Sequence, residues 1–185
     1  MAIAKDHFSE VDTDHTIQGA LNDAACNMIE QIVTELREPG RGRERRRPNR
    51  SAELDDIFNC RGGGINQRSV TADLYVGDFE GGPLFVELKS PLPNVDVAAE
   101  SKRKMLYFLA MMNRQSVSGA KAFLGLTYNP YLTRANYSHS FTKQIMDMEN
   151  EVLMGQELWD YLGGPGTYRQ LLDIIDQIPP ITSLY

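Results

Sequence analysis

The chain has 185 residues, of which 42% are hydrophobic, and its formal net charge is −6. This size and composition predict a single folded domain over residues 1–185, and no apolar run is long enough to cross a bilayer, so no membrane partner is expected. With two cysteines and no signal-peptide core at its N-terminus, the chain is not expected to form a secreted disulfide framework, and a cytoplasmic protein is predicted.

The first third of the chain is predicted to contain one helix and one basic loop. Residues 14–37 are expected to be helical, because apolar residues such as Ile17 and Leu21 recur at helical spacing and Asp14 is a suitable cap. A Pro-Gly pair ends this helix. The stretch GRGRERRRPNR follows, and its polar, Gly- and Pro-bounded composition predicts a mobile basic loop at about 39–50.

Strands and helices follow in the rest of the chain. Short consecutive strands that form an antiparallel meander are predicted at 65–71, 73–79 and 84–89. The later expected elements are a helix capped by Asp96 and running to about Asn113, a strand at 121–127, and a helical C-terminal part at about 141–178 that is interrupted near 163–166. This order predicts an α/β protein of the α+β kind, a mixed sheet flanked by helices.

The net charge argues at first sight against a nucleic-acid partner, but the charge is unevenly distributed. Residues 1–36 carry −6 and residues 122–185 carry −4, whereas residues 37–121, with fifteen basic and eleven acidic side chains, carry +4. A basic region within an acidic protein is the pattern expected of a local DNA-binding face.

The segment ADLYVGDFEGGPLFVELKSP lies inside this basic region and carries the most informative motif. Asp73 is on one predicted strand, and Glu87 and Lys89 are on the next, where alternation puts both side chains on the same face. Two carboxylates and an ammonium at adjacent strands can hold a divalent cation and activate water for phosphodiester cleavage. A second acid-x-Lys triplet, Glu100 and Lys102, is in a predicted helix, where that spacing separates the side chains.

The triad Asp73, Glu87 and Lys89 resembles the PD-(D/E)xK nuclease signature. The longer string INQRSVTADLYV…FVELKSPLPN is similar to type II restriction endonucleases of the TdeIII-like group, as is GQELWDYLGGPGTYRQLLDII more loosely. Ala72 stands where the signature has Pro. The resemblance implies a restriction-endonuclease-like core and Mg²⁺-dependent, sequence-specific cleavage of double-stranded DNA, with Mn²⁺ as a substitute ion. It also implies a homodimer of prokaryotic or phage origin, with a cognate DNA methyltransferase as functional partner.

The resemblance also assigns roles to the residues of the motif. Asp73 and Glu87 would be metal ligands, with the backbone carbonyl of Leu88 as an additional ligand. Lys89 would lower the pKa of the attacking water, orient it, or offset charge on the phosphate oxygens. Glu30, on the first helix, is either a further acid of the site or a solvated surface residue. The structural alternative for Glu87 is an ion pair with Lys89.

Three groups of residues are candidates for DNA contact. Each group has an alternative as ordinary surface charge or as part of a sheet surface. The candidates are Gln67, Arg68 and Ser69 before the Asp73 strand, Lys102, Arg103 and Lys104 at the start of the helix after the site strand, and Arg43, Arg45, Arg46 and Arg47 in the basic loop.

Two other functions fit the same sequence. The first is a PD-(D/E)xK nuclease of repair, recombination or phage type that prefers a DNA structure to a DNA sequence. The second is a non-catalytic DNA-binding module in which Glu87 and Lys89 only pair with each other. Metal-dependent cleavage into discrete fragments distinguishes the restriction type from both.

Overall fold

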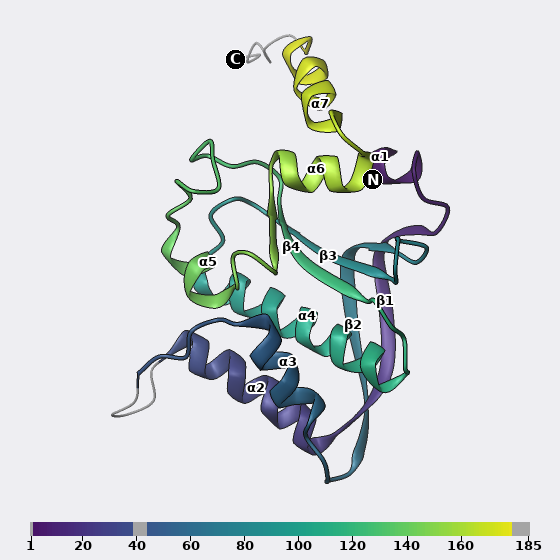
Figure 1. The fold of residues 1–185 in the computed structure, drawn as a ribbon, viewed down its shortest axis with the longest axis vertical. Coiled ribbons are helices and arrows are strands. Elements are labelled where there is room, and N and C mark those ends of the chain that lie inside the picture. The colour runs from purple at the N-terminus through teal and green to yellow at the C-terminus, as the bar shows by residue number, and fades with distance from the viewer. Residues whose placement is uncertain (1, 39–43, 179–185) are drawn as a thin grey trace, which may run out of the picture.

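The computed structural model describes residues 2–38 and 44–178 and has a five-stranded sheet with helices on both faces (Figure 1). The strands stand in chain order across the sheet: β1 (Val11–Asn22), β2 (Ile65–Val76), β3 (Leu84–Lys89), β4 (Lys121–Leu126) and β5 (Val152–Met154). β1, β2 and β3 pair antiparallel, whereas β3, β4 and β5 pair parallel. The sequence-based prediction of a mixed sheet flanked by helices is confirmed.

The helices lie in two layers, one on each face of the sheet, except the last, which packs on the helix before it and extends beyond the sheet (Figure 1). They are α1 (Ala2–Lys5), α2 (Asp23–Arg37), α3 (Arg50–Phe58), α4 (Val95–Arg114), α5 (Ser140–Ile145), α6 (Gln156–Gly163) and α7 (Thr167–Asp176). Successive side chains of β3 point to opposite faces of the sheet and so contribute to both cores. Phe85 packs into the core with α2 and α4, and Leu84 and Val86 pack into the core with α1 and α6. β3 is therefore covered on both faces. No helix in the described parts of the chain is long and apolar enough to span a membrane.

The prediction of one helix over 14–37 is wrong in its first half, because residues 11–22 form strand β1. Ile17 and Leu21 are buried, with Gly19 buried between them, and this alternation is typical of a strand. A spacing of four residues fits a strand as well as a helix, which explains the error. The helix begins at Asp23, and its cap is Asn22, whose side chain accepts a hydrogen bond from the Ala25 amide at 2.7 Å.

β2 is one continuous strand where two short strands at 65–71 and 73–79 were predicted. It pairs with β1 along nearly its whole length, from Val76 opposite Val11 to Ile65 opposite Asn22. Its pairing with β3 is short, between Leu74 and Val76 on one side and Leu84 and Val86 on the other. Asp73 therefore lies inside a strand, at the point where β2 and β3 begin to separate.

The C-terminal part predicted as helical at 141–178 contains helices α5, α6 and α7, but also the short strand β5. β5 extends the sheet by pairing parallel with β4, with Leu124 opposite Val152. The predicted interruption near 163–166 is confirmed, and Gly164 and Gly166 have positive φ there. Helix α3 had not been predicted; it begins at the end of the predicted basic loop, with Asn49 as its cap.

Candidate active site

Three polar side chains meet where β2 and β3 separate. The Lys89 ammonium donates to Asp73 Oδ2 at 2.5 Å and lies 3.1 Å from Glu87 Oε2. The Leu88 amide also donates to Asp73 Oδ2, at 2.8 Å, and so fixes that carboxylate against the β3 backbone. The structure thus brings Asp73, Glu87 and Lys89 together around one nitrogen atom.

The position of these residues in β3 explains their different environments. Glu87 is 1% exposed, whereas the Lys89 side chain, two residues on and on the same face, is 24% exposed. Burial raises the pKa of Glu87 above its usual value, although the hydrogen bond from Lys104 and the charge of Lys89 oppose this. Burial works to lower the pKa of Lys89, but its bond to Asp73 and the charge of Glu87 outweigh burial, and the pKa is raised.

Lys104 belongs to this site as well. Its ammonium donates to Glu87 Oε1 at 2.6 Å, from the middle of α4. The sequence predicted a phosphate contact for this residue, and nothing in the chain's local pattern indicated a contact with Glu87, because the two residues are on different elements. Lys104 was therefore missed as a neighbour of the motif.

The prediction that Lys102 contacts DNA is wrong. Lys102 is fully buried, and its ammonium contacts Glu53 and donates to both carboxylate oxygens of Glu151 at 2.5 Å. It is therefore not available for DNA. The expectation that these basic residues open the helix is also wrong, because α4 begins at Val95 after the cap Asn94. Consecutive helical residues point about 100° apart, so neighbouring lysines reach different partners.

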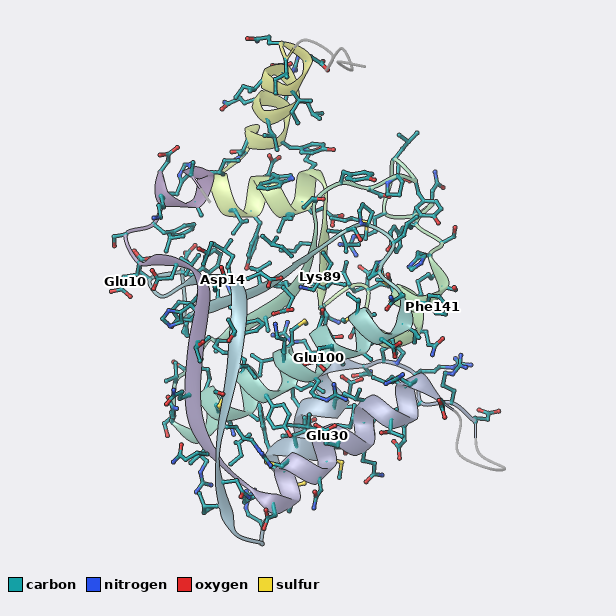
Figure 2. All side chains as sticks on the ribbon, turned by 180° about the vertical axis from the view of Figure 1, so that it is seen from behind. Glu10, Asp14, Glu30, Lys89, Glu100 and Phe141 are labelled. Carbon is teal, nitrogen blue, oxygen red and sulfur yellow. The ribbon has the colours of Figure 1, made fainter. Side chains whose placement is uncertain are left out.

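Glu30 is not brought together with Asp73 and Glu87. Its carboxylate accepts from Arg103 Nε at 3.0 Å and from the Tyr107 hydroxyl at 3.2 Å. Arg103 also contacts Glu100, so it is already paired with two acids. Figure 2 shows Glu30 and Lys89 well separated on the same face, with Glu100 between them. Among residues 2–38 and 44–178, no cluster of three or more acidic, histidine or cysteine side chains could hold a metal ion.

The two carboxylates of Asp73 and Glu87 nevertheless fit Mg²⁺. This ion commonly uses one or two protein carboxylates and takes its other oxygen ligands from water and substrate phosphates. Asp73 and Glu87 supply hard oxygen donors that face one common point, the Lys89 ammonium. The contacts of Leu88 show its amide bound to Asp73 and do not define a role for its carbonyl.

The arginines in the described part of the basic loop differ in their surroundings: Arg46 is bound to acidic residues, and Arg45 and Arg47 are exposed. Arg46 donates to Asp56 Oδ2 at 2.6 Å and to Glu35 Oε2 at 3.3 Å, which ties the loop to α2 and α3. Arg45 and Arg47 are exposed and, with Lys143 of α5, line a hollow of about 390 Å³. Arg43 lies outside the described residues.

Gln67, Arg68 and Ser69 are exposed on β2, where it pairs with β1. Arg68 Nε lies 3.4 Å from the Cys26 sulfur, a weak contact that leaves most of the guanidinium available. These three residues are on the part of β2 that extends past its pairing with β3. Strand alternation puts Arg68 on the face that meets Cys26 of α2, and Gln67 and Ser69 on the other face, so the three residues do not share one surface.

Known proteins match almost the whole chain. The family model described as "Type II restriction endonuclease, HinfI" matches residues 1–179. The type II restriction enzyme HgiBI of Herpetosiphon aurantiacus is 34% identical over 178 residues, which cover 95% of this chain and 64% of HgiBI. HgiCII of the same organism is 32% identical over the same shares of the two chains.

A more distant relative, the type II restriction enzyme MjaII of Methanocaldococcus jannaschii, is 29% identical over 81% of this chain and 43% of its own. No solved structure gives a significant match. The chain spans less than two thirds of the length of the curated relatives that it matches. Since the family model covers all but the last few residues, the chain belongs to the HinfI family of type II restriction endonucleases, which have the PD-(D/E)xK site.

Proposed function

We propose that the protein is a Mg²⁺-dependent endonuclease that cuts double-stranded DNA at a specific sequence, with Mn²⁺ as a substitute ion. The observation that carries this proposal is the convergence of Asp73 and Glu87 on the Lys89 ammonium. Membership of the HinfI family and the names of the relatives support the restriction type. The other two functions considered from the sequence have no comparable support.

In this proposal Asp73 and Glu87 hold the ion, and the Leu88 carbonyl is the candidate additional ligand. When bound, Mg²⁺ polarises a phosphate oxygen and lowers the pKa of a bound water. The Leu88 amide orients Asp73, and burial keeps Glu87 in a fixed position. Lys89 faces the same space as both carboxylates, so its charge can offset the negative charge that builds on the phosphate oxygens.

A duplex target has two-fold symmetry, and a homodimer would place one site on each strand. We therefore propose a homodimer in the cytoplasm of a prokaryote, or encoded by a phage, and a cognate DNA methyltransferase as its functional partner. The symmetry of a duplex target is the support for the dimer.

The decisive test is incubation of the purified protein with phage DNA and Mg²⁺. We expect discrete fragments of constant size, and no cleavage when a chelator removes the divalent ion. Random nicking or trimming from ends would favour the structure-preferring nuclease. Binding without any cleavage would favour the DNA-binding module.

Arg45 and Arg47 are proposed to contact the DNA backbone, because both are exposed and share a hollow with Lys143. Replacing both by Ala should weaken DNA binding to a similar extent for all sequences. The slope of log K against log salt concentration should become less steep by about 0.9 for each phosphate that the variant no longer neutralises. Binding measured by fluorescence anisotropy at several salt concentrations, without divalent ion, checks this.

Arg169, exposed on α7, provides a matched control. Arg169→Ala removes one arginine charge elsewhere and should leave the slope unchanged, whereas each of the single replacements Arg45→Ala and Arg47→Ala should make it less steep. If the double replacement at Arg45 and Arg47 gives the wild-type slope, these arginines do not contact the phosphates.

A further inference from the structure

Glu87 has a different lysine at each of its two carboxylate oxygens. Lys89 lies 3.1 Å from Oε2, and Lys104 donates to Oε1 at 2.6 Å. Lys89 divides its contacts between Glu87 and Asp73. Lys104 has Glu87 as its one ion-pair partner among residues 2–38 and 44–178, so its contact is specific to a proposed metal ligand.

The helix that carries Lys104 is held by the two residues that come directly before Lys104. Lys102 is fully buried between Glu53 and Glu151, and Arg103 is bound to Glu30 and Glu100. The backbone of Lys104 is thereby fixed relative to the sheet. Its side chain is 24% exposed and has a flexible four-carbon stem, so the ammonium can leave Glu87 without movement of the helix.

A carboxylate that is only 1% exposed requires a cationic partner. Lys104 provides that partner at the oxygen that Lys89 does not contact. A divalent ion held by both Asp73 and Glu87 would lie on the Oε2 side of Glu87, where the Lys89 ammonium is, and its charge would repel the Lys104 ammonium at Oε1. Lys104 and a divalent ion therefore compete for Glu87.

We propose that Lys104 is a positioning residue that holds Glu87 in place before metal binding and sets the divalent-ion concentration at which the site fills. This inference rests on the proposed function, in which Asp73 and Glu87 hold the ion. It assigns Lys104 to the cleavage site, where the sequence had predicted a contact with the DNA backbone.

The test is a calorimetric titration of the protein alone with Mn²⁺, comparing wild type with Lys104→Met. Lys104→Met should bind Mn²⁺ about tenfold more tightly than wild type. We take this magnitude from protons, because one neighbouring charge changes the proton affinity of a carboxylate by about tenfold or more. Lys104→Arg should bind as wild type does. Lys104→Gln, which keeps a hydrogen-bond donor for Glu87, should shift affinity in the same direction as Lys104→Met.

Arg103→Met provides the matched control, because it removes a positive charge from the adjacent residue whose acids are Glu30 and Glu100. Its affinity for Mn²⁺ should stay within about twofold of wild type, since its partners lie apart from Glu87. A tightening as large as that of Lys104→Met would indicate a general charge effect and overturn the specific role of Lys104.

Thermal unfolding gives a second measurement that does not depend on the calorimeter or on cleavage. Without divalent ion, Lys104→Met should unfold at a lower temperature than wild type, because buried Glu87 loses one of its two cations. Saturating Mn²⁺ should raise the unfolding temperature more for the variant than for wild type. Equal increments in the two proteins would contradict the competition.

Equal or weaker Mn²⁺ binding by Lys104→Met overturns the inference, and so does a wild-type protein that binds no Mn²⁺. Failure of the proposed function is observed separately, when wild-type protein that binds the ion leaves DNA uncut in Mg²⁺. The two results are distinguishable because the titration contains no DNA.

Discussion

Glu87→Gln should reduce DNA cleavage by about 10³-fold or more. The replacement keeps the shape of the side chain and removes the negative charge that we propose binds Mg²⁺, and a metal ion contributes several kcal/mol to transition-state stabilisation in such reactions. Asp73→Asn should have an effect of similar size, since Asp73 and Glu87 converge on the same point beside Lys89. Single-turnover cleavage of a plasmid in Mg²⁺ measures the loss.

The fold should survive Glu87→Gln. Lys89 keeps its bond to Asp73, and the buried position disfavours a charged side chain, so the free energy of unfolding should change by about 1 kcal/mol or less. Glu80→Gln, in the exposed turn between β2 and β3, makes the same chemical change away from the site and should cut as wild type does. Cleavage by Glu87→Gln at the rate of Glu80→Gln would remove Glu87 from the site.

Lys102→Met should destabilise the protein by about 3–5 kcal/mol, the usual cost of removing one partner from a buried ionic group. Lys102 is fully buried, and it is the cation between Glu53 of α3 and Glu151, the residue that precedes β5. Without it two carboxylates remain buried close together. Urea unfolding followed by circular dichroism measures the loss from the shift in midpoint at constant slope.

The stability lost in Lys102→Met should become smaller as the pH is lowered. Burial raises the pKa of Glu53, although the charge of Lys102 opposes this, and removing Lys102 raises that pKa further. A carboxyl group whose pKa is higher in the folded state binds a proton preferentially there, so the folded state gains stability as pH falls toward the ordinary glutamate pKa. The difference between Lys102→Met and wild type should therefore be largest near neutral pH and become smaller on acidification.

Two further variants test the explanation. Arg103→Met changes the next residue of α4, whose ion pairs are partly exposed, and should cost about 1 kcal/mol or less. Adding Glu53→Gln to Lys102→Met should recover part of the lost stability, because it removes one of the two buried charges and keeps an acceptor for the Asn49 amide. If Lys102→Met costs no more than Arg103→Met, the buried group has no special role in stability.

The fate of the basic triplet on α4 shows what a sequence cannot determine. Lys102, Arg103 and Lys104 have the same chemistry and are consecutive, so the sequence suggested one shared role in DNA contact. In the structure Lys102 binds Glu151, Arg103 binds Glu30 and Lys104 binds Glu87. Each partner is distant in the chain, and the rotation of the helix against the sheet decides which lysine or arginine meets which acid.

The local sequence pattern is also insufficient to identify β1 as a strand. Its apolar residues Ile17 and Leu21 are four positions apart, which is compatible with both a helix and a strand. Only the long pairing with β2 and the buried alternation at Gly19 distinguish the strand. The energy of that choice comes from contacts with residues about 50 positions away, and no local pattern contains them.

By itself the sequence determined strand β3 with its residues 84–89, helix α4 with its C-terminal end to within one residue, and the grouping of Glu87 with Lys89 on one strand face. The cap of α4 is Asn94, two residues before the predicted cap Asp96. These features depend on neighbours in the chain: apolar β-favouring residues between a Gly-Gly-Pro turn and Ser-Pro, a polar residue at the helix cap, and the two-residue period of a strand. The resemblance to the nuclease signature had predicted that Asp73 joins Glu87 and Lys89, and the structure brings the three together. The tertiary structure alone decided that Lys104 holds the second oxygen of Glu87 and that Lys102 is buried. The physical reason is that hydrogen bonds and ion pairs between different elements form only when packing has fixed how the helices and strands face one another.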